Sequence, residues 1–357
     1  MIVDAHIHFE ALEVYDRQLA DLEYGGADQF CVLVMDRLGN APDAFRQAQG
    51  IWMKSQNPGR AFLFGGIDWE GVFDKGREVP DLPLVPQAQR LQALGFDGLK
   101  LITGKPGPRR TLGVALDGAA MRPLLEWLEE SRFPVLWHVG DPPEFWSEAT
   151  APEWARPKGW WYDESYPSKA MIDAEMERVL QRHPRLNLIL PHFFFLADRL
   201  EEAAAFLERH PAVSIDLAPG VEWMHHLSAN REAGREFFVR HSRRIIYGSD
   251  LGMLHNATHR DRAPTLRRFL ETGEVIALPP DPFMVPDDRP DLCGLALPPE
   301  VLREIYAANF HRIIGRVVPR PLEREGIAAY LRELAAQEAA AGGEGGDAGR
   351  IARALGT

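Results

Sequence analysis

The chain begins Met1-Ile2-Val3-Asp4-Ala5-His6-Ile7-His8, a short apolar run that ends in two histidines one residue apart. The run predicts a β-strand. Because strand side chains alternate between two faces, His6 and His8 share one face and lie roughly 7 Å apart along the strand. Two imidazoles at that spacing can bind one ion. Taken alone, however, the pattern suits an ordinary alternating strand better than a metal site, so the rest of the chain decides the interpretation.

Seven further apolar runs follow the first, and helical patterns separate them. The runs predict strands at residues 30–36, 61–68, 97–102, 134–140, 186–192, 212–218 and 244–250. Nearly continuous apolar runs are typical of parallel strands that are covered on both faces. Eight strands that alternate with helices predict an α/β fold, a (β/α)8 TIM barrel. A doubly wound open sheet competes with it, but that fold has a glycine-rich phosphate turn after the first strand, which this sequence lacks.

The barrel is expected to occupy residues 1–318, with long loops after the fifth and eighth strands. The first of these loops runs from Asp141 to Tyr166, and the second is an insertion at roughly 251–297. Residues 104–113 are rich in Pro, Gly and basic side chains, which indicates a shorter loop. Residues 319–357 are predicted to form a C-terminal helical extension, which serves as a packing arm or an oligomer contact.

The composition limits the partners of the protein. A net charge of −12 over 357 residues argues against nucleic acid and anionic membranes, since both require a basic surface. Cys31 and Cys293 have no metal-type spacing and fit a reducing compartment. No apolar run approaches the ~20 residues of a membrane helix, and the first strand leaves no room for a leader peptide. We therefore expect a cytoplasmic protein that acts on a small molecule, and a homo-oligomer is compatible with the sequence.

Chemically active side chains gather at the predicted carboxyl ends of the strands, where the active site of this fold lies. They are His6 and His8 on the first strand, Lys100 on the fourth, His138 on the fifth, His192 on the sixth and Asp250 on the eighth. Four of the 12 histidines fall at these few positions, which favours a metal site over chance.

Neutral imidazoles with a carboxylate and an open position suit a catalytic divalent cation, most often zinc. Such an ion lowers the pKa of bound water towards ~7 and polarises a substrate oxygen. Asp250 could bind the ion and take a proton from that water. His192 could orient the water or act as a general acid or base.

The same residues resemble the amidohydrolase superfamily, in particular its amidohydrolase 2 or amidohydrolase-related branch. That branch contains hydrolases and decarboxylases of the aminocarboxymuconate semialdehyde and resorcylate types. The similarity spans about residues 1–318 and includes the closing segment Ile305-Tyr-Ala-Ala-Asn-Phe-His-Arg-Ile-Ile-Gly315. The resemblance implies one metal ion and assigns His192 as the acid/base near its bound water. The ligands that it implies are His6, His8, His138 and Asp250.

Lys100 has three interpretations. In the binuclear members of the superfamily that the chain resembles, a lysine on the fourth strand is carboxylated and bridges two metals, so a second ion is expected if Lys100 is modified. A cationic Lys100 would instead pair with a carboxylate of the substrate. The third interpretation is a structural pairing with Asp4 or Asp68. Gly98, Lys100 and Ile102 share one strand face, which places the lysine inward.

Further side chains on the loops after the strands are candidates for substrate contact. Arg37, after the second strand, could bind a substrate carboxylate bidentately. Trp160 and Trp161, in the loop after the fifth strand, form either an aromatic lid or an oligomer contact. Four histidines also lie on this side of the barrel, namely His225, His226, His255 and His259. His183 and His210 precede prolines at helix ends and are interpreted as structural.

These patterns together predict a metal-dependent hydrolase that cleaves a C–N or C–O bond with metal-activated water. The alternative is non-oxidative decarboxylation of an aromatic or unsaturated carboxylic acid. Arg37 and Lys100 facing the metal would favour decarboxylation, and two metals bridged by Lys100 would favour hydrolysis. A phosphodiesterase-like barrel resembles the chain less, because its fourth strand tends to carry an acid where this chain has Lys100. A non-catalytic metal-binding protein is the last alternative.

Overall fold

The protein is described by a computed structural model that covers residues 1–38, 45–70, 82–218, 221–252, 259–278, 291–340 and 346–356. Eight parallel strands stand at its centre, and each pairs with its neighbour in the sequence. They are β1 (Val3–Ile7), β2 (Gln29–Leu33), β3 (Ala61–Gly65), β4 (Gly98–Gly104), β5 (Val135–Val139), β6 (Leu188–Leu190), β7 (Val213–Asp216) and β8 (Ile245–Ile246).

Backbone hydrogen bonds join the first strand to the last and close the sheet. Ala5 N donates to Tyr247 O at 3.0 Å, Asp250 N to His6 O at 2.8 Å, and His8 N to Leu251 O at 2.7 Å. The predicted (β/α)8 TIM barrel is therefore confirmed, and the closure joins the two segments that carry His6, His8 and Asp250.

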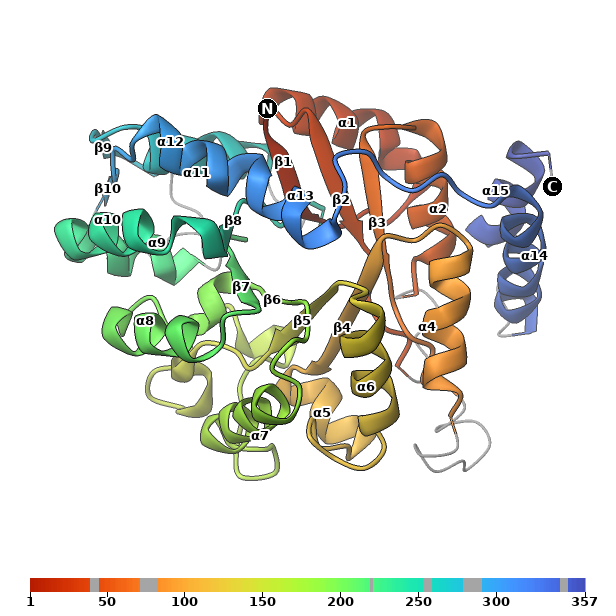
Figure 1. Cartoon of the computed structure of the whole chain (residues 1–357), viewed down its shortest axis with the longest axis horizontal. Coiled ribbons are helices and arrows are strands. Elements are labelled where there is room, and N and C mark those ends of the chain that lie inside the picture. The colour runs from red at the N-terminus through yellow and green to blue at the C-terminus, as the bar shows by residue number, and fades with distance from the viewer. Residues whose placement is uncertain are drawn as a thin grey trace.

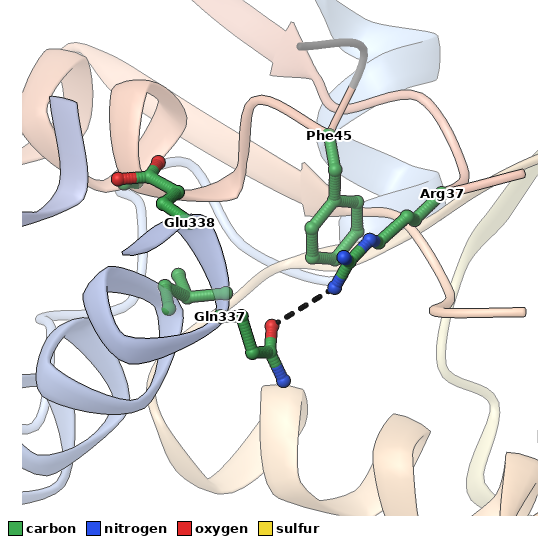
Figure 2. A pocket seen from close by; sticks show the side chains of 6 residues that line it. Arg37, Phe45, Gln337 and Glu338 are labelled. Atoms are coloured by element: carbon green, nitrogen blue, oxygen red, sulfur yellow. Dashed lines mark hydrogen bonds between the residues drawn. The ribbon is translucent and has the colours of Figure 1, made fainter. Parts of the chain in front are cut away.

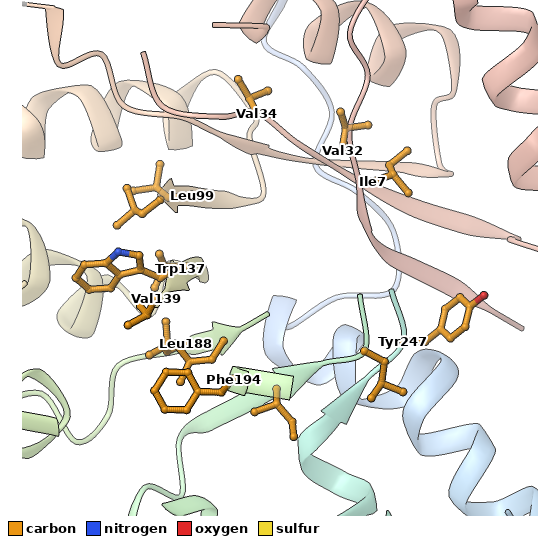
Figure 3. Close-up of a cluster of buried hydrophobic side chains, with 14 of the residues drawn as sticks. Ile7, Val32, Val34, Leu99, Trp137, Val139, Leu188, Phe194 and Tyr247 are labelled. Atoms are coloured by element: carbon orange, nitrogen blue, oxygen red, sulfur yellow. The ribbon is translucent and has the colours of Figure 1, made fainter. Parts of the chain in front are cut away.

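Helices surround the barrel, as Figure 1 shows. Those that follow strands β1 to β7 include α1 (Tyr15–Tyr24), α2 (Gln47–Gln56), α4 (Leu84–Ala93), α6 (Arg122–Ser131), α7 (Lys169–Arg182), α8 (Leu200–Arg209), α9 (Val221–Ala229) and α10 (Arg231–Arg240). The main core contains strand residues such as Ile7, Val32 and Leu99 (Figure 3). It also contains helix residues such as Leu22 and Ile51.

A second buried cluster includes Val3, Phe62, Ile246 and Phe310, and the rings of Phe62 and Phe310 meet edge to face at 5.0 Å. Phe310 belongs to the segment that closes the barrel, which consists of α12 (Pro299–Arg303), a π-helical turn η9 (Glu304–Ala308) and α13 (Asn309–Ile314). Burial of these large apolar side chains stabilises the barrel below its functional end.

The predicted loop at residues 104–113 is wrong. β4 continues to Gly104, and α5 (Pro106–Leu112) follows it directly. Pro106 sits at the start of the helix, where its fixed φ and missing N–H are tolerated, and Gly113 ends it with φ +66°. Pro and Gly therefore mark the two ends of a short helix here rather than a loop.

The long loops predicted after the fifth and eighth strands contain short elements of their own. The loop after β5 includes the 3-10 turns η4 (Pro143–Trp146) and η5 (Arg156–Lys158). The described part of the segment after β8 includes α11 (Arg262–Glu271) and an antiparallel pair, β9 (Val275–Ile276) with β10 (Leu292–Cys293).

The C-terminal extension packs against the outside of the barrel. α14 (Arg324–Ala340) and α15 (Asp347–Ala354) lie together beside α2 and α4, at the edge of the molecule in Figure 1. Arg90 of α4 donates two hydrogen bonds to Glu333 at 2.6 and 2.7 Å, and Gln49 donates to Asp347 at 3.0 Å. The extension thus packs against the barrel, and its predicted role in an oligomer contact and the domain boundary at residue 318 stay predictions.

Among the described helices, none combines the length and the apolar character that crossing a membrane requires.

Candidate metal centre

Three predicted ligands converge at the seam where the barrel closes. His6 and His8 lie at the end of β1 and Asp250 lies in the turn after β8, and one ligand atom of each falls within 4.8 Å of the other two. His6 Nε2 and His8 Nε2 are each 3.4 Å from Asp250 Oδ1. All three side chains are buried. Two imidazoles and a carboxylate that meet in this way form a donor set for one divalent cation.

The histidine ring nitrogens that face away from Asp250 are held by the protein. His6 Nδ1 lies 2.7 Å from Asp216 Oδ2, and His8 Nδ1 lies 3.0 Å from Leu33 O. Because a carboxylate and a carbonyl only accept hydrogen bonds, each Nδ1 carries the proton and each Nε2 presents its lone pair towards Asp250. Metal-binding histidines are usually oriented in this way. The residues therefore fit a metal ion in both chemistry and tautomer.

The turn Tyr247-Gly-Ser-Asp250 places the carboxylate. Gly248 passes so close to β1 that an added Cβ would lie 2.7 Å from the Cβ of His6. The Ser249 hydroxyl donates to Asp4 Oδ2 at 2.5 Å, which fixes the turn to the first strand. Asp250 then adopts a left-handed φ of 55°, a conformation that Asp tolerates better than most residues. Each residue of this short motif therefore contributes to the position of the ligand.

Asp216, at the end of β7, is a functional residue that the sequence reasoning missed. Its Oδ2 accepts from His6, while its Oδ1 accepts from the backbone N–H groups of His192 and Ala218, both at 3.0 Å. Burial alone would raise the pKa of Asp216, but its electrostatic interaction and hydrogen bond with His6 outweigh burial and lower the pKa. The signal available in the sequence was a single acid near the end of an otherwise apolar strand.

We expect Asp216→Asn to weaken metal binding by about 10- to 100-fold, the usual effect of removing a carboxylate behind a metal-binding histidine. Asparagine keeps an oxygen that can accept from the two backbone N–H groups, so the fold should persist. Competition with a chromogenic chelator measures the affinity. The control is Asp117→Asn, which removes a surface partner of Arg178. Equal affinities for wild type, Asp216→Asn and Asp117→Asn would show that Asp216 does not support the site.

His192 and His138 extend the cluster. The ring centroid of His192 is 5.4 Å from that of His6 and 4.9 Å from that of His138. His192 Nδ1 lies 3.2 Å from Ala218 O, and His138 Nε2 lies 3.0 Å from Gly140 O and 3.2 Å from Asp141 Oδ1. His138 is outside the group of three close ligand atoms, so its assignment as a fourth ligand stays a prediction.

Both of these histidines are neutral at pH 7. Burial, reinforced by neighbouring positive charge, lowers the pKa of His138 to about 4 and that of His192 to about 3. With one ring nitrogen donating to the protein, His192 Nε2 and His138 Nδ1 are left as lone pairs. A neutral imidazole can bind a cation or accept a proton, so both predicted roles are chemically open to them.

A left-handed turn holds His192 at the rim of the barrel. The four residues His192, Phe193, Phe194 and Phe195 have φ values of 58°, 56°, 51° and 53°. Left-handed conformations cost L-residues roughly 1–2 kcal/mol each, and such strain tends to occur at functional sites. The buried phenylalanine rings that pack on the core stabilise the turn.

Lys100 is buried in β4 close to these groups. Burial lowers the pKa of Lys100 to about 8, although the negative charges of Asp216 and Asp250 oppose the shift. Within the described residues Lys100 makes no ion pair. Asp4 accepts from Ser249, and Asp68 lies 3.5 Å from Arg37. The structure thus shows neither of the predicted structural pairings, and the carboxylated and cationic interpretations are left.

Arg37 has structural partners. Its guanidinium forms ion pairs with Glu70 and Asp68 and donates to Gln337 Oε1 of α14 at 3.2 Å (Figure 2). None of these partners belongs to the histidine cluster. Among the described residues Arg37 therefore makes no ion pair or side-chain hydrogen bond with the histidine cluster, and its predicted contact with a substrate carboxylate is untested.

The two predicted tryptophans differ in their relation to the cluster. Trp160 packs against Phe145 at 6.5 Å, and Lys105 Nζ lies 4.5 Å from its ring centroid. Lys105 also donates to Asp141 at 2.7 and 2.9 Å, and Asp141 in turn contacts His138. Trp161 is contacted by Arg156, 5.9 Å from its ring centroid. The aromatic loop is thus linked to His138 through Lys105 and Asp141, and direct contact of Trp160 or Trp161 with substrate stays a prediction.

The further histidines named in the sequence analysis fall into two groups, those at helix ends and those on the loop side of the barrel. His183 and His210 lie at helix ends beside Glu129 and Glu177, at 3.3 and 3.0 Å, which agrees with a structural role. His225 is buried in α9, and His226 lines a cavity of about 250 Å³. His255 and the side chain of His259 lie outside the described residues.

Comparisons with known proteins give a family and a fold. A family model described as amidohydrolase matches residues 71–316. A comparison with curated proteins finds no match.

Several solved structures are similar to this chain. An uncharacterized TIM-barrel protein from Bordetella bronchiseptica matches with a TM-score of 0.56 and 13% identity, over 88% of this chain and 99% of its own. The 4-oxalomesaconate hydratase of Rhodopseudomonas palustris has a TM-score of 0.56 and 13% identity, over 89% and 96%. A dihydroxybenzoic acid decarboxylase from a Polaromonas species, with bound manganese and the inhibitor 2-nitroresorcinol, has a TM-score of 0.51 and 12% identity, over 88% and 96%. At these identities the likeness shows the fold alone.

Proposed function

Since the chain belongs to the amidohydrolase family, we propose that it is a metal-dependent hydrolase that cleaves a C–N or C–O bond of a small organic substrate. One observation carries the proposal. His6, His8 and Asp250 bring their ligand atoms within 4.8 Å of one another, and Asp216 and Leu33 O fix both histidines in the metal-binding tautomer. A purely structural strand would not require this arrangement.

His6, His8 and Asp250 would hold the cation, with His138 as the fourth ligand. A bound divalent cation supplies Lewis-acid polarisation of a substrate oxygen and an acidified water. The imidazole and carboxylate donors favour zinc, and manganese is the alternative that the Polaromonas decarboxylase illustrates.

The protein's own residues supply the proton transfers. His192 is neutral at pH 7 and donates Nδ1–H to Ala218 O, so its Nε2 can take a proton from water and return it to the leaving group. Asp250 places a carboxylate oxygen beside the Nε2 lone pairs of His6 and His8 and is suited to binding a cation together with them. Asp216 acts through His6, whose orientation it fixes.

Decarboxylation of an aromatic or unsaturated acid is the second candidate. Its specific support is Lys100, a buried lysine whose cationic form is favoured by the negative charges of Asp216 and Asp250. This cation could pair with a carboxylate of the substrate. Arg37, the other cation expected in such a pocket, pairs with Glu70 and Asp68 instead. Decarboxylation is therefore supported by Lys100 but not by Arg37.

Assays of the full-length protein separate the two. We expect hydrolysis of members of an amide, lactone and ester panel, a loss of at least about 100-fold on chelation, and recovery with added zinc or manganese. The parallel panel contains aromatic acids such as 2,6-dihydroxybenzoate, with release of carbon dioxide as the readout. Carbon dioxide release without hydrolysis would favour the second candidate. Hydrolysis that survives complete metal removal would contradict both.

A further inference from the structure

Asp141 is a buried carboxylate, just after β5, that accepts hydrogen bonds from three different side chains. Its Oδ1 accepts from Lys105 Nζ at 2.7 Å and from His138 Nε2 at 3.2 Å, and its Oδ2 accepts from Lys105 Nζ at 2.9 Å. The hydroxyl of Tyr162 also donates to Oδ2. Because Asp141 is 2% exposed, these donors replace water around it and hold the carboxylate in one orientation.

The hydrogen bond from His138 affects how that ring can bind a cation. Gly140 adopts a φ of 74°, and its carbonyl oxygen accepts from the same Nε2 at 3.0 Å. Both acceptors require the proton on Nε2, so Nδ1 carries the lone pair. The Gly140 carbonyl alone would select this tautomer. The carboxylate of Asp141 adds a negative charge, which makes the imidazole a stronger donor for a metal ion.

Tyr162 connects this carboxylate to the loop after β5, residues 141–166. The Tyr162 side chain is 2% exposed and belongs to a small core with Phe145 and Ala155. Its ring centroid lies 4.9 Å from that of Trp146, and its backbone N–H donates to Phe145 O at 2.8 Å. The hydroxyl is therefore presented to Asp141 from a packed part of the loop rather than from a freely moving chain.

Lys105 balances the charge of Asp141. It lies between β4 and α5, and its Nζ contacts both the carboxylate and the ring of Trp160, 4.5 Å from the centroid. A buried carboxylate without a partner would be costly, so the ion pair stabilises the arrangement. Because the pair has no net charge, its long-range attraction for a cation is small. The direct contact with His138 is then the main way in which Asp141 can influence the metal centre.

We propose that Asp141 is a positioning residue of the metal centre and that the Tyr162 hydroxyl makes the loop 141–166 part of the support of His138. Asp141 acts through His138, whose ring it orients and whose donor strength it raises. The packing of the aromatic loop then contributes to the metal affinity. The inference rests on the proposed function, because it takes His138 as the fourth metal ligand.

Zinc affinity, measured by competition with a chromogenic chelator, tests the inference without a substrate. Asp141→Asn keeps an oxygen that can accept from His138 but loses the charge, and it should weaken zinc binding by about tenfold or more. Tyr162→Phe keeps the packed ring and every charge, and it should weaken zinc binding by about threefold or more. This variant keeps the test decisive if Asp141→Asn fails to fold. The matched controls are Asp163→Asn, exposed in the same loop, and Tyr166→Phe, whose ring lies 5.0 Å from that of Tyr162; both should bind zinc within about twofold of the wild type.

A double-mutant cycle separates positioning from a general structural or long-range electrostatic effect. His138→Ala should itself weaken zinc binding. If Asp141 acts through His138, adding Asp141→Asn to His138→Ala should change the affinity by less than about twofold. An equal loss from Asp141→Asn in both backgrounds would overturn the inference.

Wild-type affinity in Asp141→Asn, in Tyr162→Phe or in His138→Ala would overturn it as well. In those cases metal-dependent hydrolysis by the wild type would still support the proposed function. If the zinc affinities follow the expected pattern while every hydrolysis assay fails, the role of Asp141 stands and the proposed function falls.

Discussion

His6→Ala and Asp250→Asn should each reduce the metal content to less than about a tenth of an ion per chain and lower kcat/KM by roughly 1,000-fold or more. Each substitution removes one of three donors that lie within 4.8 Å of one another. His6→Ala also leaves the buried Asp216 carboxylate without the imidazole N–H that donates to it. Elemental analysis of the purified variants measures the metal, and the best hydrolase or decarboxylase substrate measures the activity.

The barrel should survive both substitutions. The hydrogen bonds that close it, from Ala5 N to Tyr247 O and from Asp250 N to His6 O, use backbone atoms that alanine and asparagine retain. Asparagine also tolerates the left-handed φ of 55° at position 250. His183→Ala, which removes a histidine from a helix end, is the control and should keep its metal. Wild-type metal content in His6→Ala and Asp250→Asn would refute the site.

The part of the site that sequence reasoning predicted depends on local periodicity and on one rule of the fold. His6 and His8 were placed on one face by strand alternation, and the carboxyl end of the eighth strand was predicted to bring Asp250 to them. The structure joins these three residues at the closing seam. Strand order and direction were enough here, because the position of a strand end in a (β/α)8 barrel follows from topology.

The parts that were missed depend on contacts between segments far apart in the chain. Asp216 holds His6 across 210 positions, and Gln337 engages Arg37 across 300. The hydrophobic periodicity of a sequence does not indicate such long-range pairs. The position of Arg37 after a strand suggested a contact with substrate. Sequence patterns do not place the C-terminal helix α14, which carries Gln337, beside this arginine.

Local backbone conformation was the other gap. The segment from His192 to Phe195 has left-handed φ values but contains no glycine, so its sequence does not indicate this conformation. Packing of Phe193 and Phe194 in the core stabilises it. Conversely, Pro106 and Gly113 suggested a loop but begin and end a helix. In both segments the residue type permits more than one conformation, and tertiary contacts select among them.

The state of Lys100 determines whether the histidine cluster would hold one ion or two. Both the cationic and the carboxylated state are chemically accessible to this lysine. Because burial lowers its pKa to about 8, the amine is uncharged in roughly one chain in ten at pH 7, against roughly one in 3,000 for an ordinary lysine. Only the uncharged amine reacts with carbon dioxide, so burial makes carboxylation easier. In the other chains Lys100 is charged, and the negative charges of the nearby Asp216 and Asp250 favour this cationic form.

We expect one metal ion per chain and an intact mass without a carbon dioxide adduct, because the described residues contain one close group of three ligands and Lys100 is predominantly cationic at pH 7. Lys100→Met should then retain the ion and lower kcat/KM by about 100-fold, since it removes the cation that would contact the substrate. Lys100→Arg keeps a positive charge that cannot be carboxylated, and it should retain more activity than Lys100→Met. Lys169→Met, which removes a lysine paired with Asp173, is the control for the loss of a lysine elsewhere. Two ions per chain with an adduct, falling to one ion in both Lys100 variants, would establish the bridged pair of metals instead and would favour hydrolysis over decarboxylation.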